Sequence, residues 1–328
     1  MNDFVVADPK HRLRYTVDTP GNISHGRLGR GCRLARASQR TAHWLPPVVP
    51  EAESTASAWR AGTAMVLQKE YRIVLPVSVE EYSCAQVYMT SRTSLAEAMD
   101  QDGAGVEILA NRPAEHRTLG PCQYTKKVFH IDKRFPSWLR MIAPKSGSYL
   151  LEESWNAYPS TITEVTFPMF SSFRILVESH HLPDRGDSNP HGLDKAARKN
   201  CEIVRIDIAE RRGPDDQSKS QHGPGETDLQ TFRSKCGRGP FLQNWQQEVK
   251  PVMCAYKKVT CEVQVWGMAA KVENFMQAYE LDLFHKANKN TICWMDEWHG
   301  LTMHELRLFE ADAQLRINLI SRIKQVPS

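Results

Sequence analysis

The 328-residue chain lacks the sequence features of several protein classes. No run of apolar residues approaches the roughly 20 that a bilayer-spanning helix needs. No positively charged start followed by an apolar core indicates a secretory signal. The eight cysteines form no C-x-x-C pair and no zinc-ligand spacing with histidine. We therefore expect a cytoplasmic protein with reduced thiols and no metal site.

Catalytic motifs are also missing. The chain contains no G-x-S-x-G, no H-E-x-x-H and no visible nucleophile–base set. His180 and His181 are adjacent, but no third ligand lies at a telling spacing, so a solvated loop is their expected context. The net charge of +4 is too small to indicate a nucleic-acid-binding surface. A hydrolase is the least favoured class, and no nucleic-acid partner is expected.

Acidic side chains are absent from residues 19–50, where arginines recur among glycines and serines. The segment ends in the linker-like run WLPPVVPEAESTASA. Its composition would suit a targeting peptide, but aspartates near the start argue against one and favour a disordered extension. We predict that residues 1–64 form an Arg-, Pro- and Ser-rich extension and that residues 65–325 form one domain.

From residue 65 onward the apolar residues follow the periods of strands and helices. Strands are predicted at EYRIVLP, GVEILANRP, QYTKKVFHI, STITEVTF, FRILVES, CEIVRIDIA and MCAYKKVTCEVQVW. Long surface loops are predicted between Ser179 and Trp245, where the composition turns to Gly, Pro, Asp and Ser. Two adjacent lysines, Lys257 and Lys258, interrupt the last strand.

Helices are predicted from capping boxes and apolar stripes. The box S-x-x-E at Ser78 begins a helix that extends to about Met89, and T-x-x-E at Thr302 begins the last helix. A long apolar stripe predicts another helix before it, with the members Val272, Phe275, Met276, Tyr279, Leu283, Ala287, Thr291, Trp294 and Trp298. This order of elements predicts an α+β fold, with an antiparallel sheet and helices on one face.

Polar side chains interrupt two of the predicted packing faces. Thr125 and Lys127 share one face of their strand with Phe129. Glu310 falls on the apolar stripe of the last helix. An edge strand whose lysine reaches solvent would explain the first interruption, and a core ion pair between Lys127 and Glu310 would explain both. The alternative is a cavity that holds something anionic.

The order and wording of these segments resemble the phosphatidylinositol transfer proteins from residue 65 to about residue 325. The matching tracts are KEYRIVLPVSVEEY, GVEIL, QYTKK, ESWNAYP, FRSKCGRGP, MCAYKKVT, WGMAAKVENF, CWMDEW and LTMHELRLFE. A lone Trp266 before GM, and YPSTITE, are more similar to the retinal-degeneration-B type (cytoplasmic, class II-like) than to the first class. The resemblance implies one START-related domain: a concave, mainly antiparallel sheet closed by long helices around one phospholipid.

The resemblance also implies roles for individual residues. The headgroup-binding positions are Thr125, Lys127, Asn156 and Glu310. An ammonium and a hydroxyl can satisfy a phosphodiester, while a carboxylate and an amide oxygen can accept from inositol hydroxyls. Three further roles are implied: Thr161 and Thr163 line the cavity, Trp266 docks on membranes, and Ser234 matches a phosphorylation position. A plain loop serine is the alternative at Ser234. Thr161 stands where the first class carries a cysteine associated with choline lipids.

The expected function is lipid transport without catalysis, metal or cofactor other than the phospholipid cargo. A water-exposed acyl chain costs about 0.8 kcal/mol per methylene, so a carrier must enclose it. We expect a cytoplasmic monomer, transiently peripheral at membranes, that extracts, shields and delivers single phosphatidylinositol molecules. Phosphatidic acid and phosphatidylcholine are the candidate second cargoes. The alternative is a lipid-gated adaptor that presents phosphatidylinositol to a kinase or another partner.

Overall fold

The computed structural model describes residues 65–100, 105–130, 148–169, 173–210, 228–263 and 269–325. The chain divides into two units, Met1–Arg60 and Ala61–Ser328, and every described residue belongs to the second. The predicted extension over residues 1–64 and the predicted membrane-docking residue Trp266 therefore lie outside the described residues.

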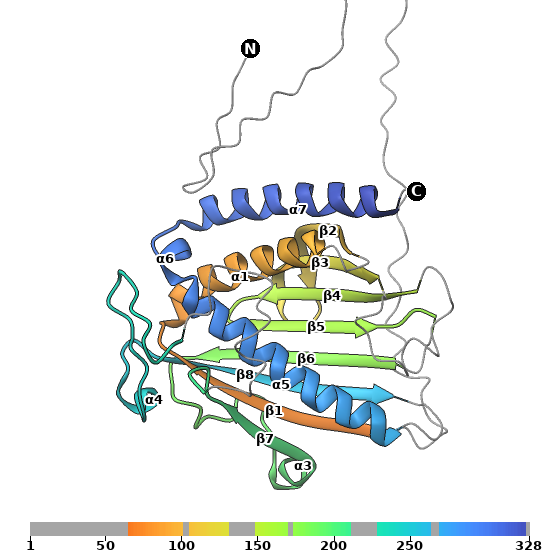
Figure 1. The fold of residues 1–328 in the computed structure, drawn as a ribbon. Helices are drawn as coiled ribbons and strands as arrows, with labels where there is room; N and C mark the ends of the chain where they lie inside the picture. The colour runs from red at the N-terminus through yellow and green to blue at the C-terminus, as the bar shows by residue number, and fades with distance from the viewer. Residues whose placement is uncertain are drawn as a thin grey trace, which may run out of the picture. The chain divides into compact units, whose positions relative to one another are not determined.

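Within the described residues, one eight-stranded sheet has the order β2-β3-β4-β5-β6-β8-β1-β7 (Figure 1). The strands are β1 (Met65–Leu75), β2 (Val106–His116), β3 (Gly120–His130), β4 (Tyr149–Ala157), β5 (Ser160–Thr166), β6 (Phe173–Leu182), β7 (Cys201–Ile206) and β8 (Met253–Val263). Neighbouring strands are antiparallel except β1 and β7, which are parallel. The predicted α+β class and mainly antiparallel sheet are confirmed.

Strand β4 was not predicted from the sequence. Its sequence YLLEESWNA carries two adjacent glutamates, which break the apolar alternation expected of a strand. In the sheet these carboxylates lie opposite lysines of β3: Glu152 is 3.4 Å from Lys127 and Glu153 is 3.5 Å from Lys126. Opposite charges paired across strands stabilise the register, and the strand is visible only once its partner is known.

The longer helices are α1 (Val79–Met99), α5 (Ala269–Cys293) and α7 (Met303–Gln325); shorter ones are α3 (Lys195–Asn200), α4 (Trp245–Glu248) and α6 (Met295–Trp298). Both predicted capping boxes are confirmed. The Ser78 hydroxyl accepts from the Glu81 amide at 3.1 Å, and the Thr302 hydroxyl accepts from the Glu305 amide at 3.3 Å. The first helix continues beyond the predicted end near Met89, because serines on its buried face obscure the apolar period there.

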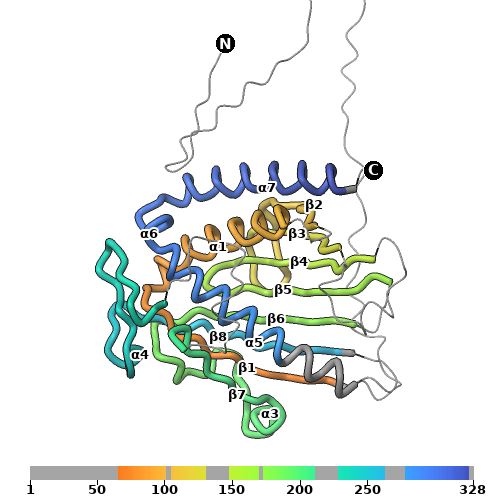
Figure 2. The backbone as a smooth tube through the Cα atoms, in the orientation of Figure 1, coloured from red at the N-terminus to blue at the C-terminus, as the bar shows by residue number. Residues whose placement is uncertain are grey.

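Helices α1 and α5 lie over one face of the sheet, here called the inner face (Figures 1 and 2). The main core forms where α1, α5 and α6 meet β1 and β8, with Tyr71, Tyr82 and Trp298 among its fully buried members. A second apolar cluster joins α1, β2 and α7 through Ala98, Val106 and Ile317. The centre of the sheet, β4 and β5, contributes to neither cluster of buried residues.

The apolar stripe predicted for this region is confirmed at its end, where Thr291, Trp294 and Trp298 are buried, but it is wrong in the middle of α5. Tyr279 and Leu283 are 50% and 42% exposed, and the buried line passes through Glu280, Phe284 and Asn288 instead. Two of these buried side chains are polar, and each accepts a hydrogen bond from a core tyrosine. Tyr71 donates to Glu280 at 3.0 Å, and Tyr82 donates to Asn288 at 3.1 Å. A stripe chosen by hydrophobicity alone could not include them.

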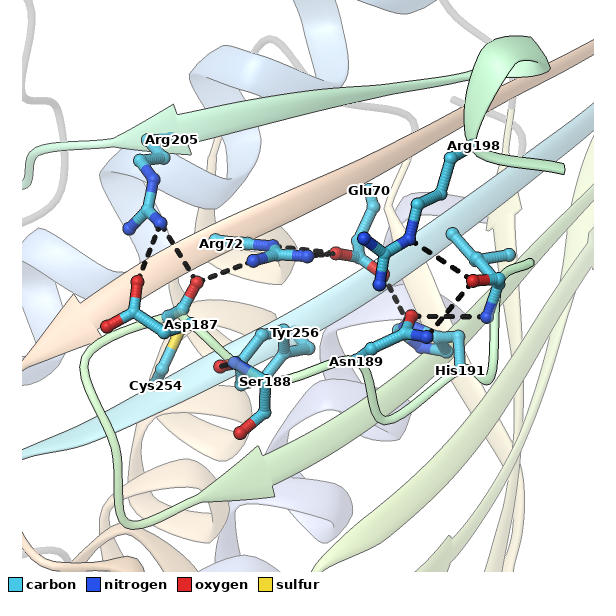
Figure 3. A network of polar contacts seen from close by, with 12 residues as sticks. Glu70, Arg72, Asp187, Ser188, Asn189, His191, Arg198, Arg205, Cys254 and Tyr256 are labelled. Carbon is cyan, nitrogen blue, oxygen red and sulfur yellow. Dashed lines mark hydrogen bonds and ion pairs between the residues drawn. The ribbon is translucent and has the colours of Figure 1, made fainter. Parts of the chain in front are cut away.

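The opposite, outer face of β1 is covered by residues 183–194, part of the region predicted as long loops (Figure 3). Arg72 donates to the Gly186 carbonyl at 2.6 Å and to Glu70 at 2.7 Å, while His191 lies 2.8 Å from Glu70. Burial alone would raise the pKa of Glu70, but the hydrogen bonds from His191 and Arg72 outweigh it and lower that pKa. A buried ion network therefore fastens this loop to the sheet.

Candidate functional site

A band of polar side chains crosses the inner face of the sheet. Residues paired between neighbouring strands direct their side chains to the same face. One such row contains Gln123, Asn156, Thr161, Ser179, Lys257 and Tyr71. The adjacent row contains Thr125, Ser154, Thr163, Val177, Val259 and Lys69. Lys127 lies two residues after Thr125 along β3 and therefore on the same face. The register thus places on one face all five sheet residues proposed from the sequence: Thr125, Lys127, Asn156, Thr161 and Thr163.

Three of the four expected headgroup residues line one small cavity of about 40 Å³. Thr125 and Lys127 reach it from β3, and Glu310 reaches it from α7. Its remaining lining residues are Thr90, Ser91, Ser94, Ile108, Asn111, Ala313 and Ile317. Asn156 does not line this cavity and lies one row along the same face, where it accepts a hydrogen bond from Thr161 at 3.3 Å.

The polar side chains of α1 and β2 in this lining were not identified from the sequence. The serines and threonine of α1 fall beyond its predicted end, and Asn111 lies in a strand that also carries the polar residues Glu107 and Arg112. The α1 residues Thr90, Ser91 and Ser94 can be placed on one side of the helix only once α1 is known to extend to Met99.

Lys127 is buried, with 8% of its surface exposed, and β3 is an interior strand. The explanation by an edge-strand lysine that reaches solvent is therefore wrong. The Lys127 ammonium lies 3.3 Å from the Ser94 hydroxyl and 3.4 Å from the Glu152 carboxylate. Glu310 instead pairs with Arg307 at 2.6 Å, so among the described residues the two do not form the core ion pair that was the other explanation.

The central strands are covered more loosely than their neighbours. Every residue of β4 and β5 is half-buried, whereas β1 and β8 carry fully buried side chains such as Tyr71, Ile73 and Ala255. Thr161, Thr163, Ser154 and Asn156 on the inner face are therefore less completely covered than the inner-face residues Tyr71 and Ile73 of β1. The polar band lies across this loosely covered zone.

Lys257 is a second cation on the inner face. Burial lowers its pKa to about 8. Its ammonium lies 3.4 Å from the Ser179 hydroxyl and 5.3 Å from the centre of the Phe284 ring, and it has no carboxylate partner among the described residues. The interruption of the β8 sequence by two lysines was the visible signal; the second, Lys258, pairs with Glu178 at 2.5 Å on the outer face. A half-buried cation without a counter-ion is able to receive an anionic ligand.

Two further buried groups, one on β6 and one on α5, have unsatisfied atoms. Nε2 of His181 and Oε1 of Glu280 have no hydrogen-bond partner within the described part of the chain. Burial lowers the pKa of His181 to about 3 and raises that of Glu280 to about 7. Unsatisfied buried polar atoms are rare in native proteins, and they are often explained by an absent ligand or water.

The solvated loop predicted for His180 and His181 is wrong, because both lie in β6 and His181 is only 3% exposed. Ser234 and His180 lie outside the polar band. Ser234 is 8% exposed in a tight turn, where its hydroxyl accepts from the Arg238 amide at 2.8 Å. His180 lies 2.9 Å from the Ser160 hydroxyl. No group of three metal-ligating side chains occurs in the described ranges, and no helix within them is long and apolar enough to cross a membrane.

Comparison with known proteins gives consistent matches to this part of the chain. The family model described as phosphatidylinositol transfer protein matches residues 66–315. Human membrane-associated phosphatidylinositol transfer protein 2 is 41% identical over 258 residues, which are 76% of this chain and 19% of that relative. Cytoplasmic phosphatidylinositol transfer protein 1 of Drosophila melanogaster is 36% identical over 77% of this chain and 91% of its own length. The human phosphatidylinositol transfer protein beta isoform is 40% identical over 79% of this chain and 96% of its own length.

Proposed function

Because the chain belongs to the phosphatidylinositol transfer protein family, we propose that it extracts single phosphatidylinositol molecules from one membrane and delivers them to another. The observation that carries this proposal is the shared cavity of Thr125, Lys127 and Glu310 beneath α7. It brings a buried cation, a hydroxyl and a carboxylate together although they are far apart in the sequence. This set matches the charge and hydroxyls of an inositol phospholipid.

Each side chain has a definite role in the proposed complex. Lys127 and Thr125 donate to the phosphodiester oxygens, while Glu310 and Asn156 accept from ring hydroxyls. Arg307, which now pairs with Glu310, must release that carboxylate when the ring binds. The cavity of about 40 Å³ has room for little more than a water molecule. Cargo entry therefore requires α7 to move away from β3.

The inner face supplies a second anchoring point. Lys257 lies in the same row as Thr161 and Ser179, on the face that Lys127 also occupies. Donation by Lys257 to an anionic cargo would give it the counter-ion that it lacks in the described structure. Thr161 and Thr163 lie between the two lysines along this face, and we assign them to the cavity lining.

The remaining assignments follow from the family and the expected chemistry. We propose a cytoplasmic, monomeric carrier of the retinal-degeneration-B type that acts at membrane surfaces without catalysis, with Trp266 as a membrane contact. Phosphatidic acid is the second cargo that the subtype implies. Ser234, with its buried hydroxyl, would accept a phosphate only if its turn opens.

The experiment that tests the proposal compares Thr125→Ala with Thr118→Ala, an exposed threonine in the turn of the same β2–β3 hairpin. Loss of one hydrogen bond to a charged group costs about 1.5–3 kcal/mol, so phosphatidylinositol binding should fall roughly 10- to 100-fold only at position 125. Lipid bound to purified protein is identified by native mass spectrometry, and transfer is measured between vesicles.

Equal phosphatidylinositol retention by Thr125→Ala and the parent chain would defeat the headgroup assignment. Glu310→Gln provides a second comparison, because it should weaken inositol lipid binding while phosphatidic acid binding is largely kept. A structural role would instead unfold Glu310→Gln. Lipid binding without transfer between vesicles would indicate the lipid-gated adaptor.

A further inference from the structure

Helix α7 has apolar side chains on two opposite faces. Leu306, Ala313 and Ile317 are fully buried where α7 packs against α1 and β2. A second line, here called the outer stripe, consists of Leu308, Leu315, Leu319 and Ile323. These four side chains are 59%, 72%, 60% and 65% exposed. Their spacing of seven, four and four residues aligns them along one side of the helix.

A helix on the surface of a globular domain normally keeps polar residues on its solvent-facing side. Single exposed leucines need no explanation, but an aligned row of them indicates an interaction surface. Among the other helical side chains whose exposure the structure describes, which exclude residues 269–277, α5 presents two large apolar ones, Tyr279 and Leu283, and α1 presents Met99. The outer stripe is therefore unusual for this chain.

The charges around the outer stripe indicate what it contacts. Asp312 is the exposed carboxylate within the stretch that the outer stripe spans, and no aspartate or glutamate follows it in residues 313–328. Arg316 and Arg322 are exposed beside Leu315, Leu319 and Ile323, and the ion pair of Arg316 with Asp312 is long, at 3.6 Å between exposed side chains. An apolar face bordered by arginines has the composition of a helix that lies in the interface of an anionic bilayer.

We propose that the outer stripe, with Arg316 and Arg322, is a membrane-docking surface selective for anionic lipid. The leucines and the isoleucine enter the acyl boundary, and the two guanidinium groups contact lipid phosphates. This surface lies on the side of α7 opposite Ala313 and Ile317, which line the headgroup cavity.

Docking through α7 has a consequence for cargo exchange. The inward side of the helix provides Glu310, Ala313 and Ile317 to the cavity lining, and its outward side carries the outer stripe. A bilayer that binds the outward side acts on the same helix that must move for cargo to enter. The inference thus adds a membrane contact to the proposed function but does not depend on the identity of the cargo.

The test uses the full chain and flotation with phosphatidylcholine vesicles that contain or lack phosphatidylserine. The variant Leu315→Gln/Leu319→Gln/Ile323→Gln keeps good helix formers in α7. It should bind phosphatidylserine-containing vesicles roughly tenfold or more weakly, because three apolar side chains are lost from the interface. Bound lipid and melting temperature should match the parent chain.

A matched control changes exposed apolar residues on other elements: Leu109→Gln/Ile203→Gln/Leu242→Gln, whose side chains are 54%, 41% and 60% exposed. This control should bind vesicles as the parent chain does. Arg316→Gln/Arg322→Gln should lose the preference for phosphatidylserine and much of the salt dependence, with no change on pure phosphatidylcholine. If the triple α7 variant fails to fold, Leu315→Gln alone should still weaken binding.

Undiminished vesicle binding by the folded α7 variant would overturn the proposal. A parent chain that is dimeric by light scattering, with a monomeric α7 variant, would also overturn it and assign the outer stripe to a second copy of the chain. Thr125→Ala separates this inference from the proposed function, because it should lose phosphatidylinositol and still bind vesicles. If Thr125→Ala lost vesicle binding together with the triple α7 variant, the docking surface would not be separate from the headgroup cavity.

Discussion

The buried carboxyl group of Glu280 on α5 shows how burial changes the ionisation of a single side chain. Burial raises the pKa of Glu280 to about 7, although the hydrogen bond from Tyr71 opposes the shift. Its second oxygen is buried without a described partner. The carboxyl is therefore protonated over a pH range in which an exposed glutamate would be charged.

This difference predicts a pH-dependent contribution to stability. Between about pH 4.5 and about pH 7 the folded state holds a proton on Glu280 that the unfolded state has released, so this contribution falls as pH rises. Its full size is up to about 3 kcal/mol. Glu280→Gln, which keeps an acceptor for Tyr71, should remove it. Urea unfolding at acidic and at neutral pH measures the difference between the two chains.

Other groups titrate in the same window, so only the comparison isolates Glu280. The pKa of His181 is lowered to about 3, which makes its own contribution rise with pH between about 3 and about 6.5. The parent chain and Glu280→Gln share this contribution of His181, so it cancels in the comparison. Parallel pH profiles for Glu280→Gln and the parent would contradict the assignment.

At the scale of elements, local patterns predicted the helix caps and the buried face of α7 but not the pairing of strands. The helix caps at Ser78 and Thr302 could be predicted because a capping box is complete within four residues. β4 was not readable, because Glu152 makes sense only opposite Lys127, and that pairing is not local in sequence. The stripe predicted for α5 was wrong at Tyr279 and Leu283 for a similar reason, since buried Glu280 depends on Tyr71 of a distant strand.

The candidate site shows the same division. Lys127 and Glu310 were detectable as polar residues on apolar faces, and the family resemblance supplied Asn156. Lys257 was visible as an interruption of a strand, yet its burial and its missing counter-ion depend on where α5 lies. Sequence patterns therefore indicated which residues are out of place, and the register showed which of them share a face.

The loop network on the outer face allows a prediction about one element. Arg72→Met should lower the free energy of unfolding by about 3–5 kcal/mol, because Glu70 stays buried without its main counter-ion. Arg205→Met is the matched control: Arg205 also donates to the Gly186 carbonyl but is exposed, so its loss should cost about 1 kcal/mol or less. Denaturant unfolding of both variants provides the comparison.

Glu70 adds a second, pH-dependent check on the same network. Its folded pKa is lowered, so its contribution is complete above the ordinary value of 4.5 and is lost as pH falls through the folded pKa. Adding Glu70→Gln to Arg72→Met should restore part of the stability. A double variant no more stable than Arg72→Met would show that the buried charge is not the cause.

At the scale of the whole molecule, the first question is how much of the chain the transfer domain needs. The first described strand begins at Met65, and the match to the family begins at residue 66. We predict that a chain starting at Met65 keeps the melting temperature and the transfer rate of the full chain. Calorimetry and a vesicle transfer assay test this, and a marked loss of either quantity would show that residues 1–64 contribute.

The second question is whether the empty fold is less stable because it is built to hold an anion. Burial lowers the pKa of Lys257 to about 8, so below that pH its charge destabilises the cargo-free protein by up to about 3 kcal/mol. Lys257→Met should raise the free energy of unfolding of delipidated protein by a similar amount and weaken phospholipid binding. It should also abolish the rise in stability expected between about pH 8 and about pH 10.5.

The neighbouring lysine provides the opposite expectation. Lys258 already pairs with Glu178, so Lys258→Met should leave stability unchanged or reduce it slightly and should not affect bound lipid. A Lys257→Met protein that gains stability and keeps its full cargo would separate the buried charge from lipid binding. A protein that loses both stability and cargo would mean that Lys257 supports the fold itself. Only a gain in stability with a loss of bound phospholipid fits a cation held on the inner face for an anionic lipid.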